Sequence, residues 1–280
     1  RAVAWTLDDL HRRAVARVAP TRRRRRGPEE EVLDRDLVLR DDEVVILDPT
    51  TPDPSIVFRA AAASAYCGRP LERASLAALG AHRGTLASDP APWTPATLNA
   101  FISLLGSGAA VVPVWESLDH HGLLTPFLPE WDRVRCRPQR NAFHRYTVDR
   151  HLLAAAAEAS RLTRSVERPD LLLLAAFLHD IGKGYPGDHT DAGVEVLAPI
   201  CRRMGITEPD LAVLTTLVRE HLLLASAATG RDLADPATAE WVASRVGDVE
   251  VLDLLAALTE ADSLATGETA WSRWKSDLLE

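Results

Sequence analysis

The sequence predicts a mainly α protein, in which a helical bundle follows a helical scaffold region that carries a small β-hairpin. Apolar residues recur at helical spacing through most of the 280 residues. Proline and glycine divide these stretches into segments of ordinary helix length. The exception lies within residues 36–47, where DLVL and EVVIL flank a turn near residues 40–42. These short runs, rich in Val, Ile and Leu on either side of a turn, predict two hairpin strands.

Composition and charge exclude several classes of protein. A hydrophobic content of 46% is enough for a real core, and a net charge of −8 argues against general nucleic-acid binding. The unbroken basic run Arg22–Arg26 lacks interleaved aromatic residues, so we interpret it as a solvated linker. Contact with a phosphate group or an acidic partner is the alternative for this run.

The cysteines indicate a reducing compartment. Cys67, Cys136 and Cys201 are far apart, odd in number and without a CxxC motif. Neither a disulfide framework nor a thiolate metal site is therefore predicted. We find no signal-peptide pattern and no apolar run of transmembrane length, so we expect a cytoplasmic protein that does not enter the membrane.

The first region, residues 1–140, is expected to be scaffold. Its predicted helices cover about 1–19, 54–66, 71–80 and 95–105, with a charged linker between the first of them and the hairpin. The pair His120–His121 precedes Gly122 at a predicted helix end, and no partner motif flanks it. We interpret the pair as surface or capping polarity rather than as a ligand site.

The second region, residues 141–280, is predicted to be a bundle of apolar helices without strands. The predicted helices cover about 148–165, 171–182, 191–204, 207–224, 236–246 and 248–265, and a last segment at 269–279 carries Trp271 and Trp274. Thr207 and Asp210 predict a capping box at the start of the fourth helix.

The functional interpretation centres on Leu171–Gly184, LLLLAAFLHDIGKG. Pro169 and Asp170 are typical of a helix start, and His179 and Asp180 stand side by side at its exit. An imidazole and a carboxylate at the end of a buried helix are costly to desolvate unless something compensates them. A bound metal ion is one such compensation.

Further candidate ligands occur on other segments of this region. They are His151 early in its helix, His189 in the loop after the HD pair, His221 late in the capped helix, and Asp262 in an apolar helix. Each alone has an ordinary explanation, such as a hydrogen-bonded core histidine or a helix cap. Together they favour a metal site, and ligands of imidazole and carboxylate suit Mn²⁺, Fe²⁺, Mg²⁺ or Zn²⁺.

The order His151, His179–Asp180, Asp262 resembles the H…HD…D signature of the HD-domain superfamily of metal-dependent phosphohydrolases. Longer blocks resemble one family within it, the bifunctional uridylyltransferase/uridylyl-removing enzymes that act on the PII nitrogen-signalling protein. These blocks are FHRYTVDRH (143–151), LHDIGKG (178–184), GDHTDAG (187–193), LVREHLLL (217–224) and LTEADSLATGETAWSRWKSDLL (258–279). The hairpin, the broken helices and LPEW (128–131) are similar to that family's middle region.

The resemblance implies a phosphodiesterase that removes UMP, or AMP, from a modified tyrosine of PII. It implies that His151, His179, Asp180 and Asp262 hold a first divalent ion, with Mn²⁺ or Mg²⁺ expected first and Fe²⁺ or Zn²⁺ as alternatives. Asp180 would also orient water or bridge to a second ion. His189 and His221 would be ligands of that second ion or acid/base groups at the phosphate.

Three further residues receive substrate roles from the same resemblance. Lys183 could neutralise phosphate charge, although a cation at a helix carboxyl end is the structural alternative. His144 and Arg145 precede the first ligand helix and could reach the substrate.

The chain also departs from the family. The family's nucleotidyltransferase motif, a Gly-Gly pair followed by spaced aspartates, is not found here, and neither are its two ACT domains. We therefore expect the nucleotidyl-removing half of a parent enzyme that is also a nucleotidyltransferase. One alternative is an HD-superfamily phosphohydrolase that acts on small free nucleotides. Another is a helical regulatory module with a degenerate site, although all four candidate first-ion ligands are present.

Overall fold

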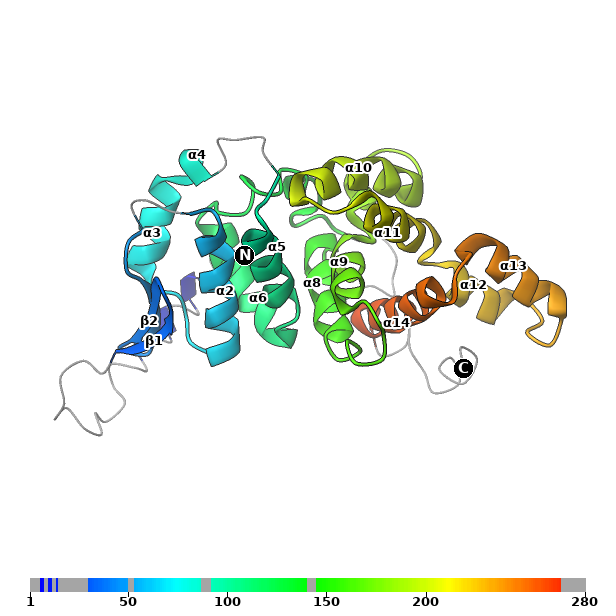
Figure 1. Ribbon diagram of the computed structural model, residues 1–280, viewed down its shortest axis with the longest axis horizontal. Helices are drawn as coiled ribbons and strands as arrows, with labels where there is room; N and C mark the ends of the chain where they lie inside the picture. Colours follow the sequence, from blue (N-terminus) through cyan, green and yellow to red (C-terminus); the bar gives the residue numbers. More distant parts are fainter. Residues whose placement is uncertain are drawn as a thin grey trace.

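The computed structural model describes residues 6–7, 10–11, 14, 30–49, 53–86, 92–139 and 145–267. In these residues the chain is mainly helical with one small antiparallel sheet, which confirms the predicted fold class (Figure 1). The predicted helix at 1–19 lies largely outside the described residues. The basic run Arg22–Arg26 and the segment with Trp271 and Trp274 lie wholly outside them.

The sheet has three strands in the order β1-β2-β3, at Glu31–Asp34, Leu37–Arg40 and Glu43–Ile46. The predicted hairpin corresponds to β2 and β3, which pair from Leu37 with Ile46 to Arg40 with Glu43. Its two turn residues, Asp41 and Asp42, both have positive φ, as a tight hairpin turn with right-handed twist requires. Strand β1 was not predicted, because its sequence, EVLD, is short, acidic and mostly exposed.

Within the described part of residues 1–140, seven helical segments follow the sheet. They are α2 (Ser55–Cys67), α3 (Arg73–Ala81), α4 (Arg83–Leu86), α5 (Pro95–Leu105), η1 (Gly108–Ala110), α6 (Val111–His120) and α7 (Trp131–Val134). His120 ends α6, and the ring of His121 lies 2.9 Å from the carbonyl oxygen of Ser117, which matches the capping interpretation of this pair.

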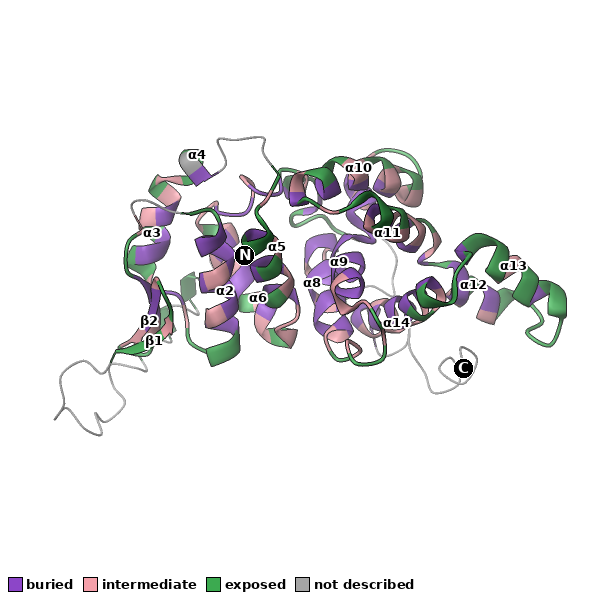
Figure 2. Ribbon diagram, viewed as in Figure 1, coloured by how far each residue is buried: buried purple, intermediate pink, exposed green. Residues whose placement is uncertain are grey.

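The second region contributes the rest of the fold. Its elements are α8 (Val148–Ala159), α9 (Pro169–Leu178), η2 (Ile181–Gly184), α10 (His189–Met204), α11 (Glu208–Glu220), α12 (Leu223–Gly230), α13 (Pro236–Val246) and α14 (Val249–Thr266). Helices α8 and α9 lie at the centre of the molecule and are mostly buried, whereas α13 lies at one end and is largely exposed (Figures 1 and 2).

Aromatic side chains of α5, α6 and α7 pack against the central helix α9. Phe177, two residues before the HD pair, stacks on Trp131 with ring centroids 5.3 Å apart and an angle of 10° between the rings. It also meets Phe101 and Trp115 edge to face at 5.4 and 5.1 Å. Contacts of this kind stabilise beyond the burial of their area. The last turn of α9 is therefore held by side chains of α5, α6 and α7.

Three helices end several residues earlier than predicted. Helix α8 ends at Ala159 rather than near residue 165, because Ser160, Thr163 and Ser165 hydrogen-bond back to carbonyls three residues earlier. Helix α9 ends at Leu178, and a 3₁₀ turn follows Asp180. Helix α11 ends at Glu220, and the separate helix α12 follows it.

The cap of α11 is as predicted, since the hydroxyl of Thr207 accepts a hydrogen bond from the backbone N–H of Asp210. The stretch Glu208–Gly230 is long and apolar enough to cross a membrane by length and composition, which the sequence prediction did not include. Helices α5 and α6 pass that test only as a pair bent by 111°. Core helices pass the same test, and Leu214, Leu217 and Val218 of α11 are completely buried in the core.

Candidate metal centre

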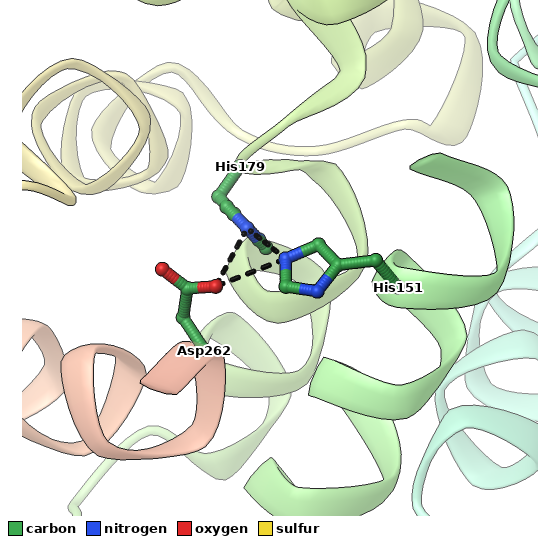
Figure 3. A group of neighbouring side chains, drawn as sticks. All are labelled: His151, His179 and Asp262. Carbon is green, nitrogen blue, oxygen red and sulfur yellow. Dashed lines mark hydrogen bonds and ion pairs between the residues drawn. The ribbon is translucent and has the colours of Figure 1, made fainter. Parts of the chain in front are cut away.

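Three side chains from separate helices form the first ligand group. Nε2 of His151 on α8 lies 2.9 Å from Oδ1 of Asp262 on α14 and 3.2 Å from Nε2 of His179 at the end of α9. The distance from Nε2 of His179 to Oδ1 of Asp262 is 3.5 Å. Figure 3 shows the three side chains pointing at one another from their helices. Both histidines are buried, and Asp262 is 18% exposed.

The tautomer of His179 suits a metal ligand. Its Nδ1 lies 3.0 Å from the carbonyl oxygen of Ala176, so the Nδ1–H donates there and Nε2 is the ring nitrogen that faces the group. Hydrogen bonds of this kind typically orient metal-binding histidines. The position of His179 explains this hydrogen bond. His179 directly follows the last turn of α9, and the carbonyl groups of a last helical turn have no N–H partner within the helix.

Asp180, His189 and His221 form the second ligand group, with ligand atoms all within 4.8 Å of one another. Oδ1 of Asp180 lies 3.7 Å from Nε2 of His221 and 3.8 Å from Nε2 of His189. Nδ1 of His221 lies 2.8 Å from the carbonyl oxygen of Val218, which leaves its Nε2 available as well.

The buried oxygen of Asp180 distinguishes this group from an ordinary polar cluster. Oδ1 of Asp180 is buried and accepts no hydrogen bond from the described residues. A buried carboxylate oxygen without a donor is costly in free energy, and such groups are rare in folded proteins. A cation between this oxygen and the two imidazoles would remove the cost.

Asp180 also connects the two groups. Its other oxygen, Oδ2, lies 3.5 Å from Nε2 of His179 and 3.6 Å from Nε2 of His151. One carboxylate thus faces the first group with Oδ2 and the second group with Oδ1. This is the arrangement that a carboxylate bridging two ions requires.

The charges are strongly coupled in the metal-free protein. Burial opposes a charge on His179, but the carboxylates of Asp180 and Asp262 outweigh it and raise its pKa to about 10. Burial tends to raise the pKa of both carboxyls, yet the positive charge on His179 holds them well below the ordinary value. Burial, followed by repulsion from His179, lowers the pKa of His221 to about 4.

The residues present fit a divalent ion. Their donors are imidazole nitrogens and carboxylate oxygens without thiolate, which suits Mg²⁺ and the first-row divalent metals. Ligand atoms lie 2.9 to 3.5 Å apart in the first group, and Oδ1 of Asp180 lies 3.7 and 3.8 Å from the two imidazoles of the second group. Such separations suit a shared ion at metal–ligand distances of about 2.0–2.2 Å. The cluster can therefore hold a divalent metal ion.

The structure brings together all six side chains that the sequence marked as ligands. One local assignment was wrong, since His189 lies in the first turn of α10 and not in the preceding loop. Asp188 is the N-cap of that helix and accepts the backbone N–H groups of Thr190 and Asp191, so the helix starts early enough to carry His189. His189 is 28% exposed, more than any other member of the cluster.

Of the three residues predicted to contact the substrate, only Lys183 is seen to contact the cluster in the described part of the chain. Nζ of Lys183 lies 2.5 Å from Oδ2 of Asp180 and donates a hydrogen bond to Oε1 of Gln139 at 2.9 Å. Sequence reasoning missed Gln139, because nothing in its local pattern marks it. Arg145 is exposed and lies over the ring of Tyr146. His144 lies outside the described residues.

Comparisons with known proteins agree with this geometry. The HD domain family model matches residues 148–266, which include all six side chains of the cluster. A bifunctional uridylyltransferase/uridylyl-removing enzyme of Streptomyces coelicolor is 52% identical over 245 residues, covering 87% of this chain and 29% of the relative. Enzymes of the same name from Mycobacterium tuberculosis and Corynebacterium glutamicum are 44% and 36% identical, covering 91% and 80% of this chain and 32% of each relative.

The chain spans about a third of the length of these curated relatives. The similarity nevertheless covers most of this chain, 87% and 91% of it for the first two relatives. Residues 148–266 are therefore an HD domain, within a chain that belongs to the family of bifunctional uridylyltransferase/uridylyl-removing enzymes.

Proposed function

We propose that this chain is the uridylyl-removing part of its parent enzyme, a metal-dependent phosphodiesterase that hydrolyses a nucleotidyl-tyrosine bond on a PII signalling protein. The released nucleotide is UMP, or AMP in a variant of the same reaction. The observation that supports this most directly is the carboxylate of Asp180, which faces both ligand groups and has a buried oxygen without a donor among the described residues. The relatives' name supports the substrate class.

The two ligand groups have different roles in the proposal. His151, His179 and Asp262 would hold the first divalent ion, with a contribution from Asp180. His189 and His221 would hold a second ion together with Asp180, with Mn²⁺ or Mg²⁺ as the preferred metals. When bound, such ions lower the pKa of water toward neutrality and polarise a phosphoryl oxygen.

The remaining chemistry falls to the chain's own side chains. Lys183 places a positive charge at the edge of the cluster, where it can neutralise a phosphate oxygen. His189 is the most exposed imidazole of the cluster and can contact the phosphate directly. The leaving tyrosine has a pKa near 10 and needs little protonation. Activation and orientation of the water, which we assign to Asp180, therefore dominate the barrier.

We further propose that residues 1–140 act as scaffold for a catalytic region at 141–280. The aromatic contacts of Phe177 support this division of labour, since the scaffold buries the helix end that carries His179. A nucleotidylated PII protein as partner also implies that the chain works in the cytoplasm. Arg145, exposed beside the cluster's first helix, is the proposed contact for the substrate.

The experiment compares protein-bound and free nucleotides. Purified chain with Mn²⁺ is given PII nucleotidylated on tyrosine, and released mononucleotide is measured by chromatography. We expect release by the unmodified chain and its loss in His179→Ala and Asp180→Ala. Full activity in both variants would refute the assigned site. Hydrolysis of free nucleotides without release from PII would instead support the small-nucleotide phosphohydrolase.

A further inference from the structure

Two glycines meet where the second ligand group is assembled. Gly182 lies in η2 and Gly193 in α10, and their backbones touch. A Cβ atom at Gly182 would lie 2.0 Å from the carbonyl oxygen of His189 and 2.4 Å from the backbone nitrogen of Gly193. Neither glycine has a positive φ. The close approach of two backbones, rather than a special conformation, therefore requires glycine at position 182.

The contact continues to a third element. A Cβ atom at Gly193 would lie 3.1 Å from Cγ1 of Val218 on α11. The carbonyl oxygen of Val218 is the one that accepts the hydrogen bond from Nδ1 of His221, at 2.8 Å. We call the three residues Gly182, Gly193 and Val218 the glycine contact.

Each ligand of the second group is tied to the glycine contact. Asp180 is two residues before Gly182 at the start of the same 3₁₀ turn. The backbone carbonyl of His189 packs so closely against Gly182 that a Cβ atom at position 182 would overlap it. His221 is oriented by Val218. The spacing among these three ligands thus depends on how closely η2, α10 and α11 approach one another.

The first ligand group is built differently. His151 and Asp262 come from α8 and α14, which contribute no residue to the glycine contact. His179 is held by its hydrogen bond to Ala176 within α9. A disturbance of the glycine contact should therefore leave the ligands of the first group close together.

We propose that the glycine contact is the positioning device for the second ligand group and sets the Asp180–His189–His221 spacing needed for a second ion. The proposal rests on the ligand roles given under the proposed function. Metal sites and catalytic groups tolerate displacements of less than about 1 Å before affinity or rate falls steeply. A Cβ at 2.0 Å from backbone atoms requires a shift of that size, and no side-chain rotation can provide it.

The two glycines differ in a way that supplies a matched test. The obstacle to a methyl group at Gly182 is backbone, whereas the obstacle at Gly193 is the tip of one side chain. Shortening Val218 to alanine removes that tip and keeps the carbonyl that holds His221. Gly230 in α12 has no atom within 4 Å of the position that a methyl group would take, so it provides a control for glycine replacement itself.

The experiment measures bound Mn²⁺ in the whole chain. Equilibrium dialysis gives the number of ions and their affinities, and electron paramagnetic resonance distinguishes an isolated Mn²⁺ from a coupled pair. Circular dichroism checks the fold. The variants are Gly182→Ala, Gly193→Ala, Val218→Ala, the double variant Gly193→Ala with Val218→Ala, and Gly230→Ala.

We expect two ions in the unmodified chain and in Gly230→Ala, and a single isolated ion in Gly182→Ala. Gly193→Ala should weaken the second ion by about tenfold or more, within the range seen when support around ligands is lost. The double variant should bind the second ion as tightly as Val218→Ala alone. Affinity for the first ion should fall less than affinity for the second, because His151, His179 and Asp262 lie outside the glycine contact and the two groups share only Asp180.

A folded Gly182→Ala protein that binds two coupled ions normally would overturn the proposal. If that variant does not fold, the Gly193 series decides, and a defect that Val218→Ala fails to relieve counts against the glycine contact. An unmodified chain that binds one ion would overturn the second ligand group and this proposal with it. Two bound ions without nucleotide release from PII would overturn only the proposed function.

Discussion

Nε2 of His151 lies 2.9 Å from Oδ1 of Asp262, and this contact joins the first and last helices of the HD domain. Helices α8 and α14 also pack against each other, so the two side chains meet because the bundle closes. The distance suits either a hydrogen bond or two ligands of one ion. The next experiment separates these roles.

Asp262→Asn should keep the bundle folded and weaken the first ion. A neutral amide oxygen is a poorer ligand than a carboxylate, and even changes to residues behind the ligands cost about 10–100-fold in affinity. We expect a loss at least that large by isothermal titration calorimetry with Mn²⁺. Asp253→Asn is the matched control, because Asp253 is exposed on the same helix. Equal affinities in the two variants would contradict the assignment.

Metal binding should release a proton from His179. Its pKa of about 10 in the metal-free protein means that an ion must displace this proton at neutral pH. Affinity should therefore rise by about tenfold per pH unit toward pH 10 and then level off. Calorimetry in two buffers of different ionisation enthalpy counts the released protons. Binding without proton release at about pH 7 would show that the metal does not contact His179.

The same shift makes the metal-free protein sensitive to alkali. A group whose pKa is raised on folding stabilises the fold fully below its ordinary pKa of 6.5, and this contribution is lost as the pH rises through 10. The melting temperature of chelator-treated protein should fall between about pH 7 and pH 10. Saturating Mn²⁺ should raise the melting temperature, because the ion binds only the folded state.

Lys183→Met should separate the two interpretations of this residue. If the ammonium group neutralises phosphate charge, kcat/KM falls by about 100-fold or more, while ion binding and the urea midpoint change little. If Lys183 only stabilises the 3₁₀ turn and Asp180, the urea midpoint falls and the kinetic loss is small. Lys183→Arg keeps the charge and serves as the control. Both quantities can be measured on the same preparations.

The three cysteines should differ in reactivity. Cys67 and Cys136 are exposed, whereas Cys201 on α10 is buried, and burial raises the pKa of its thiol to about 12. A thiol reagent at about pH 8 should modify two thiols per chain quickly and the third only in denaturant. Rapid modification of all three would mean that α10, which carries His189 and Gly193, does not pack as described.

Much of the local structure could be predicted from the sequence. The limits of α5 and α13 were predicted to the residue, because Pro95 and Pro236 follow capping residues and Gly106 and Gly247 end the helices. Strand β1 and the end of α8 were missed. Both lie in short polar segments whose hydrophobic pattern is weak. Strand β1 forms because it pairs with β2, and α8 ends where side-chain hydrogen bonds to the backbone replace the helical pattern.

The amino-acid sequence by itself determined which groups could bind metal, because His and Asp side chains within apolar helices need a compensating partner. Only the tertiary structure decided how these groups are divided between two sites. It divides the ligands into two groups, turns one oxygen of Asp180 toward each, and brings Gln139 of the scaffold to Lys183. These relationships depend on distances between helices, which arise from packing across the core and leave no periodic signal along the chain.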